Sequence, residues 1–194
     1  EPTGDAIDPE EMDALFPNAA SAQRRVASAG LQQKFVLVTG GPGTGKTTVA
    51  GRLLVLLASR KIDLRMALAA PTGKAAVRLG EAIGDAVSGL ASRFAGVASR
   101  LEVAAGAACT LHRLLGWQPT TGRCRFHVGN PLPYDIIVVD EASMLDLMLW
   151  DRLLEAMAPE TRLVILGDHR QLASVQPGRV LGELVVAADE GLLG

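Results

Sequence analysis

The sequence predicts an α/β fold in which a mostly parallel β-sheet is covered by helices on both faces. Apolar runs of strand length, at about 35–39, 64–70, 136–139 and 163–166, alternate along the chain with segments of helical length. The last two runs contain no polar residue. Strands that are apolar on both sides are typical of a parallel sheet buried between two layers of helices. A chain of 194 residues is long enough to build one such domain around a substantial core.

The chain divides into a short leading segment and one domain. Residues 1–20 are acidic, contain proline and have weak periodicity, so they are predicted to be a linker or the tail of an upstream domain. The domain is expected to span 21–194. Within it, 85–109 is rich in Ala, Gly, Ser and Arg with poor periodicity, and we expect an insertion of undefined structure there. Turn-forming residues in 117–133 favour either a hairpin or an irregular loop.

A glycine-rich sequence follows the first predicted strand and precedes a predicted helix. Residues 40–47 read GGPGTGKT and match the phosphate-loop pattern G-x-x-x-x-G-K-[ST]. Glycines let the backbone turn its N–H groups around an anion, and the helix N-terminus adds partial positive charge. We therefore predict a P-loop NTPase that binds ATP and Mg²⁺, with Lys46 on the β- and γ-phosphates and Thr47 on the metal. The predicted nucleotide-binding residues are Gly41, Pro42, Gly43, Thr44, Gly45, Lys46, Thr47 and Thr48.

Acidic side chains follow the third predicted strand directly. Because the carboxyl ends of parallel strands meet at one edge of the sheet, Asp140 and Glu141 are expected beside the phosphate loop. Asp140 suits a Mg²⁺ ligand that acts directly or through a bound water, and Glu141 suits the base that polarises the attacking water. After the fourth strand, Gln171 could sense the γ-phosphate and orient the water, although a loop glutamine is more often only solvated. Asp168 could equally be a structural cap for its turn.

Two further segments suit a phosphodiester backbone. The second strand is followed by a Pro-Thr-Gly-Lys turn at 71–74, which resembles an anion-binding turn at a helix start but lacks the GKT of a nucleotide site. Segment 110–113 places a hydroxyl, an imidazole and a guanidinium close together. A single histidine such as His112 is more often a surface or core residue, and Trp117 is expected to pack rather than to stack on a base. The predicted DNA contacts are Thr72, Gly73, Lys74, Thr110, His112 and Arg113.

Charge is distributed unevenly, although the net charge is only −2. Residues 24–127 hold fifteen Lys/Arg against four Asp/Glu, whereas 128–194 hold four against eleven. The basic part could form a surface for an anionic partner or could be a solvated face, and charge alone does not separate the two.

The remaining features of the sequence indicate a cytoplasmic protein. The first 23 residues carry six acids and no base, unlike a secretory signal, and no apolar run is long enough to span a bilayer. Cys109 and Cys124 lack metal-ligand spacing and are expected to be reduced thiols. Because the chain opens at Glu1 without methionine, we expect it to be part of a longer protein.

Five segments resemble, in order, motifs I, Ia, Ib, II and III of superfamily-one DNA helicases: 40–47, 70–74, 110–116, 140–143 and 167–172. The chain is most similar to the RecD subunits of bacterial exodeoxyribonuclease V, over about 20–190. The resemblance implies the N-terminal RecA-like motor domain of a helicase. It also implies ATP-driven 5′-to-3′ translocation on single-stranded DNA, in a complex with RecB- and RecC-like subunits. The nuclease activity of that family resides in another subunit, so none is expected here.

The family places a glutamine that reads the adenine upstream of the phosphate loop. Gln23 fits this position, and Gln32 and Gln33 are weaker candidates. The chain departs from the family in that nothing matches the second motor domain, which supplies the arginine finger. Leu-Ala-Ser-Val at 172–175 replaces the Leu-Pro-Pro-Val of many relatives, which favours the RecBCD-type subunit over stand-alone RecD-like helicases.

Other classes of P-loop protein fit less well. The N-K-x-D guanine reader of a GTPase is absent from the sequence, and the acidic C-terminal third offers no arginine-rich lid of a small-molecule kinase. A regulatory nucleotide-binding module with little hydrolysis is the remaining alternative. Retention of Lys46, Thr47, Asp140, Glu141 and Gln171 argues against a dead site.

Overall fold

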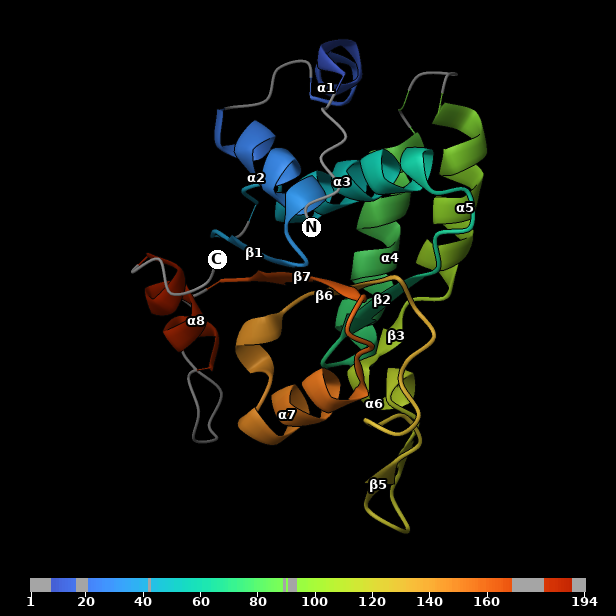
Figure 1. Ribbon diagram of the computed structural model, residues 1–194, viewed down its shortest axis with the longest axis vertical. Helices are drawn as coiled ribbons and strands as arrows, with labels where there is room; N and C mark the ends of the chain where they lie inside the picture. The colour runs from blue at the N-terminus through green and yellow to red at the C-terminus, as the bar shows by residue number, and fades with distance from the viewer. Residues whose placement is uncertain are drawn as a thin grey trace.

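The computed structural model describes residues 8–16, 21–41, 43–88, 90, 94–168 and 180–189. Its centre is a five-stranded parallel sheet with the strand order β1-β7-β6-β2-β3 (Figure 1). The predicted α/β fold with a parallel sheet is therefore confirmed, and the two-residue β3 is an addition to the four predicted strands. The strands are β1 (Phe35–Thr39), β2 (Met66–Ala70), β3 (Cys109–Thr110), β6 (Ile136–Val139) and β7 (Arg162–Gly167).

Helices cover both faces of the sheet, as the apolar strands predict (Figure 1). The face with the larger helical layer carries α1 (Pro9–Leu15), α2 (Ser21–Gln32), α3 (Lys46–Arg60), α4 (Gly73–Ser88) and α5 (Ala95–Gly106). The opposite face carries α6 (Leu111–Leu114), α7 (Leu147–Ala156) and α8 (Val180–Asp189).

Alternate side chains of each strand enter different cores. In β6, Ile136 and Val138 pack beneath α3, whereas Ile137 and Val139 pack against the layer of α6 and α7. This alternation follows from the two-residue period of a strand, and it explains why every position of β6 is apolar and buried.

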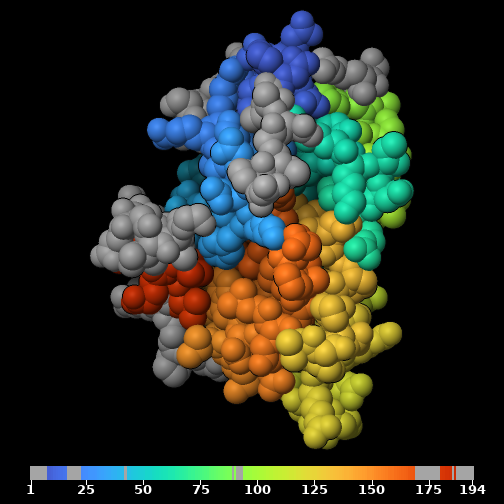
Figure 2. Space-filling view, in the orientation of Figure 1, coloured from blue at the N-terminus to red at the C-terminus, as the bar shows by residue number. Residues whose placement is uncertain are grey.

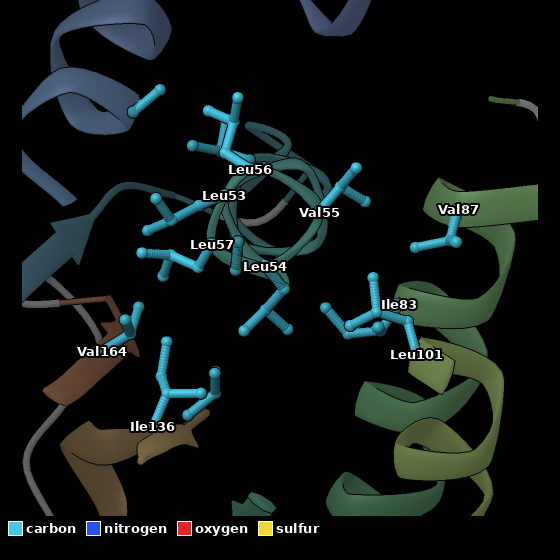
Figure 3. Packing of buried hydrophobic residues seen from close by; sticks show 14 of the residues in the cluster. Leu53, Leu54, Val55, Leu56, Leu57, Ile83, Val87, Leu101, Ile136 and Val164 are labelled. Atoms are coloured by element: carbon cyan, nitrogen blue, oxygen red, sulfur yellow. The ribbon is translucent and has the colours of Figure 1, made fainter. Parts of the chain in front are cut away.

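Helix α3 is the most enclosed helix of the larger layer. Figure 3 shows its leucines and Val55 between strand residues such as Ile136 and helix residues such as Ile83 and Leu101. Because α3 is held on several sides, its N-terminus has a fixed place at the carboxyl edge of the sheet, directly after the phosphate loop.

The two regions with weak sequence periodicity contain helices that join the core. Met12, Leu15 and Phe16 of the α1 region are buried, although 1–20 is predicted to be a linker or tail. Segment 85–109 holds the end of α4, then α5 and β3. Helices α4 and α5 pack so closely that a Cβ on Gly80 would lie 2.5 Å from the carbonyl oxygen of Ala105.

Segment 117–133 adopts the hairpin alternative. Strands β4 (Trp117–Gln118) and β5 (Arg123–Cys124) pair antiparallel, with Gly122 in the left-handed region (φ 65°). The hairpin projects from one end of the molecule (Figure 2). Both cysteines are free thiols. No helix in the described ranges is long and apolar enough to cross a membrane.

Candidate functional site

The phosphate loop joins β1 to α3 and is closed by hydrogen bonds from two of its own side chains. Gly43 and Gly45 have φ angles of 73° and 79°, a region that side-chain-bearing residues rarely occupy. Nζ of Lys46 donates to the carbonyl oxygens of Gly40 (2.6 Å) and Gly41 (2.9 Å). Oγ1 of Thr44 also donates to the Gly41 carbonyl, at 2.9 Å. The loop thus holds a cation at its centre, with the start of α3 behind it.

A cavity of about 490 Å³ opens over this loop. Residues from the loop, from α4 and from the carboxyl ends of β6 and β7 line it. The lining residues are Gly43, Thr44, Gly45, Lys46, Thr47, Thr48, Ala82, Asp140, Glu141 and Asp168. The structure therefore brings together most of the predicted nucleotide, metal and catalytic residues. Pro42 and Gln171 lie outside the described residues.

Asp140 is a partly buried carboxylate that faces the lysine of the loop. Burial raises the pKa of Asp140, and this shift is opposed by the Glu141 N–H, which donates to Oδ1 at 2.8 Å, and by the charge of Lys46. Since burial disfavours the charged form, a cation bound here would stabilise the ionised carboxylate. Thr47 lines the same cavity, so both predicted Mg²⁺ ligands lie within it.

Glu141 has an unusual backbone conformation. It is the one non-glycine residue of the described chain with positive φ (φ 52°, ψ 38°). A non-glycine residue in this region costs on the order of 1–3 kcal/mol, and such residues concentrate at functional sites. The conformation is fixed by the bond to Asp140 and by the Met144 N–H, which donates to the Glu141 carbonyl at 3.0 Å.

Asp168 is a lining residue whose role the sequence left open. It is only 4% exposed and follows β7 directly, as Asp140 follows β6. Because Asp168 follows an apolar strand of the same sheet, the sequence could have predicted that it lines the site.

Gln23 is the only one of the three candidate adenine-reading glutamines that the structure brings to the loop. A Cβ placed on Gly45 would lie 3.6 Å from Nε2 of Gln23. Gln32 is exposed at the other end of α2. The carbonyl of Gln33 accepts a hydrogen bond from the Arg162 side chain at the start of β7, on the opposite edge of the sheet.

The two predicted DNA-binding segments lie side by side at the carboxyl edge. Strands β2 and β3 lie next to each other (Figure 1). Thr110 is the register partner of Ala70, and Thr72 follows Ala70 by two residues. Oγ1 of Thr72 accepts the Ala75 N–H and Oγ1 of Thr110 accepts the Arg113 N–H, both at 3.2 Å. Each hydroxyl therefore caps a helix through its oxygen and keeps its O–H available as a donor.

The cations of these segments are solvent-accessible. Lys74, His112 and Arg113 are exposed. The half-buried Trp117 ring meets His112 edge-on, with ring centroids 6.2 Å apart and an interplanar angle of 80°. Trp117 thus packs against the segment rather than standing free above it.

Comparison with known proteins identifies the family. The model of the AAA domain family matches residues 23–177. The chain belongs to this family. The chain is 49% identical over 181 residues to the RecBCD enzyme subunit RecD of Mycolicibacterium smegmatis, covering 90% of this chain and 32% of that protein. It is 39% identical over 155 residues to the ATP-dependent RecD2 DNA helicase of Deinococcus radiodurans, covering 80% of this chain and 18% of that protein.

These matches confirm the resemblance to RecD that the motifs predict. The chain spans about a third of the length of the RecD relative. A solved structure of two coordinating Pif1 helicases at forked double-stranded DNA is similar with a TM-score of 0.49 and 23% identity, covering 88% of this chain and 37% of that one.

Proposed function

We propose that the AAA domain is the N-terminal motor domain of a superfamily-one DNA helicase. In this proposal, the full-length cytoplasmic protein hydrolyses MgATP to move 5′-to-3′ along single-stranded DNA, within an exodeoxyribonuclease V-type complex with RecB- and RecC-like subunits. The observation that carries the proposal is the convergence of Lys46, Asp140 and Glu141 on one cavity above a phosphate loop. The similarity to RecD and to the RecD2 helicase supports the choice of reaction.

The residues present fit MgATP. Asp140, a partly buried carboxylate whose pKa is raised by burial, and the hydroxyl of Thr47 would hold Mg²⁺. Lys46 would exchange its bonds to the Gly40 and Gly41 carbonyls for phosphate oxygens. When bound, Mg²⁺ would neutralise the charge that develops on the phosphates during transfer.

Glu141 acts as the base in this proposal. Its carboxylate accepts a proton from the attacking water as the new oxygen–phosphorus bond forms and the bond between the γ-phosphorus and the bridging oxygen breaks. The left-handed conformation of Glu141 fixes where its side chain leaves the backbone, at the wall of the cavity. Gln171 is proposed to orient the same water.

Gln23→Ala is expected to raise the ATP dissociation constant several-fold and to reduce discrimination against GTP. The amide can hydrogen-bond the donor and acceptor edge of adenine, and its removal leaves that edge unread. Calorimetric titration with ATP and GTP measures both effects. Gln32→Ala is the matched control, because Gln32 lies on the same helix away from the loop and its replacement should change neither affinity. Unaltered adenine preference in Gln23→Ala would transfer adenine recognition to backbone groups.

Single-stranded DNA is proposed to cross the turn at 72–74 and the segment at 110–113. Both segments present hydroxyl donors and exposed cations, which suit phosphate oxygens, and neither presents a paired donor and acceptor for a base edge. Binding should therefore tolerate any base sequence and should weaken with salt.

Lys74→Ala combined with Arg113→Ala should weaken single-stranded DNA binding of the full-length protein to a similar extent for unrelated sequences. The slope of log affinity against log salt should become shallower by up to about 1.4, since each phosphate contact on a single strand contributes roughly 0.7. Fluorescence anisotropy across a salt titration gives the slope.

Lys34→Ala combined with Lys61→Ala is the charge-matched control, because both lysines are exposed and ion-paired near the other edge of the sheet. ATP affinity without DNA should barely change in either double variant. Normal DNA binding by the Lys74/Arg113 variant at every salt concentration would mean that these residues only stabilise their helices or the solvated face.

Unwinding by the full-length protein with its RecB- and RecC-like partners tests the motor function. We expect displacement of a duplex that carries a 5′ single-stranded tail and none of a duplex with only a 3′ tail, when RecB-type motor activity is disabled by mutation. A regulatory nucleotide-binding module would bind ATP yet displace neither duplex. The full-length protein is needed because an arginine finger from a second domain accelerates related reactions roughly 10³- to 10⁵-fold.

A further inference from the structure

The hydroxyl oxygen of Ser143, two residues after Glu141, is buried without a hydrogen-bond partner. Within the part of the chain that the structure describes, the side-chain polar atoms in this condition are Arg52 Nε, Ser143 Oγ and Trp150 Nε1. Of these three, Ser143 lies nearest along the chain to a lining residue of the cavity, two residues after Glu141. A buried hydroxyl that has lost water and gained no partner destabilises the state in which it occurs. Such a group therefore requires an explanation.

Ser143 belongs to the turn that fixes the base. It lies in the 3₁₀ helix η2 (Ala142–Met144), whose last residue, Met144, is hydrogen-bonded to Glu141. The Met144 N–H donates to the Glu141 carbonyl at 3.0 Å, and the Leu145 N–H donates to the Ala142 carbonyl at 3.2 Å. Glu141 and η2 consequently move as one unit.

The same turn is packed against the end of β7. A Cβ placed on Gly167 would lie 3.6 Å from the Ser143 nitrogen and 3.7 Å from Cβ of Ala142. The Gly167 carbonyl in turn accepts the Gly40 N–H at 3.3 Å, and the Gly40 carbonyl accepts the Lys46 ammonium at 2.6 Å. A continuous set of contacts thus connects Lys46 with the turn that carries Glu141.

We propose that Ser143 is a positioning residue for Glu141, with a hydroxyl that is unpaired in the nucleotide-free protein and gains its hydrogen bond when MgATP binds. Phosphates that draw Lys46 away from the Gly40 carbonyl would release one end of this set of contacts. The turn then shifts at the end of β7 so that the hydroxyl is paired and Glu141 is held toward the water. The inference rests on the proposed function, because it concerns the same nucleotide site.

The empty and filled states give this proposal a measurable signature. A ligand stabilises the folded state by its differential interaction, so a hydrogen bond made only in the filled state must appear in the stabilisation that the ligand confers. Ser143→Ala removes an unpaired hydroxyl from the protein without nucleotide and a paired hydroxyl from the protein with bound MgATP. Its thermal midpoint without nucleotide should equal or exceed that of the wild type, and the rise in midpoint on adding MgATP should be smaller. Turnover should fall by up to about tenfold, the loss of one hydrogen bond.

Thr161→Val is the matched control, because Thr161 is also buried but its hydroxyl has a partner. Oγ1 of Thr161 donates to the Tyr134 carbonyl at 2.8 Å, at the opposite edge of the sheet. Its replacement should lower the midpoint without nucleotide, leaving turnover and the gain from MgATP unchanged.

Differential scanning fluorimetry of the full-length wild type and both variants, with and without MgATP, decides the matter together with steady-state hydrolysis. The inference is overturned if Ser143→Ala keeps the wild-type gain from MgATP, or if it loses stability without nucleotide as Thr161→Val does. A wild-type protein that gains stability from MgATP but does not hydrolyse it would overturn the motor function alone, and the midpoint comparison would still decide the role of Ser143. A wild-type protein with no gain from MgATP would overturn both.

Discussion

Lys46→Ala is expected to weaken MgATP binding roughly 10- to 100-fold, because hydrogen bonds to charged groups contribute about 1.5–3 kcal/mol. Among the described residues that line the cavity, Lys46 is the one cation. Its ammonium donates to two backbone carbonyls of the phosphate loop. Water can take the place of the ammonium at these carbonyls, so the substitution should not unfold the domain. Isothermal titration calorimetry with MgATP gives the affinity, and circular dichroism reports the fold.

Lys34→Ala is the control for the loss of one lysine charge. Lys34 is exposed, pairs with Glu160 at 2.8 Å and lies just before β1, at the edge of the sheet that does not bind nucleotide in our proposal. Its replacement should leave MgATP affinity at the wild-type value. If Lys46→Ala bound MgATP as tightly as this control, the phosphate-loop assignment would be wrong.

Glu141→Gln should retain MgATP binding and lower turnover of the full-length protein by about 10²- to 10⁴-fold, the range that a general base contributes. The amide has nearly the same shape as the carboxylate, so the left-handed turn and its bond to Asp140 should persist. It cannot, however, accept the proton of the attacking water. Phosphate release assays under saturating ATP and single-stranded DNA measure the effect.

Glu102→Gln makes the same chemical change on an exposed position of α5. Its turnover should match that of the wild type. If Glu141→Gln hydrolysed ATP at the wild-type rate, another group would have to be the base. If the variant lost ATP affinity, Glu141 would have a binding role in place of a catalytic one.

The sequence predicted those parts of the fold in which a single physical requirement determines the residue pattern. Runs such as 136–139 must be apolar on both faces when helices cover both sides, so their pattern specified a buried parallel strand. The helix after the phosphate loop was equally clear, because the motif requires it. The structure of segment 85–109 was harder to predict from the sequence. Helix α5 buries mainly small side chains and Leu101 against α4. Because small side chains allow this close packing, the segment shows little hydrophobic periodicity.

The site was predicted to a similar degree and for similar reasons. Lys46, Thr47, Asp140 and Glu141 are set by local motifs at strand ends, and they converge on one cavity. The left-handed backbone of Glu141 was not predictable, because it depends on bonds to Asp140 and Met144 that exist only in the folded turn. The contact of Gln23 with the loop also depends on how α2 packs, so the sequence left three glutamines open.

Hydrolysis of ATP by the full-length protein, measured with and without single-stranded DNA, tests the central claim most directly. We expect single-stranded DNA of unrelated sequences to stimulate hydrolysis by the wild type strongly at low salt, and this stimulation should diminish as salt rises. Glu141→Gln should show almost no hydrolysis under either condition while still binding MgATP. Hydrolysis that is indifferent to DNA, or that survives in Glu141→Gln, would contradict a DNA-driven motor built on this cavity.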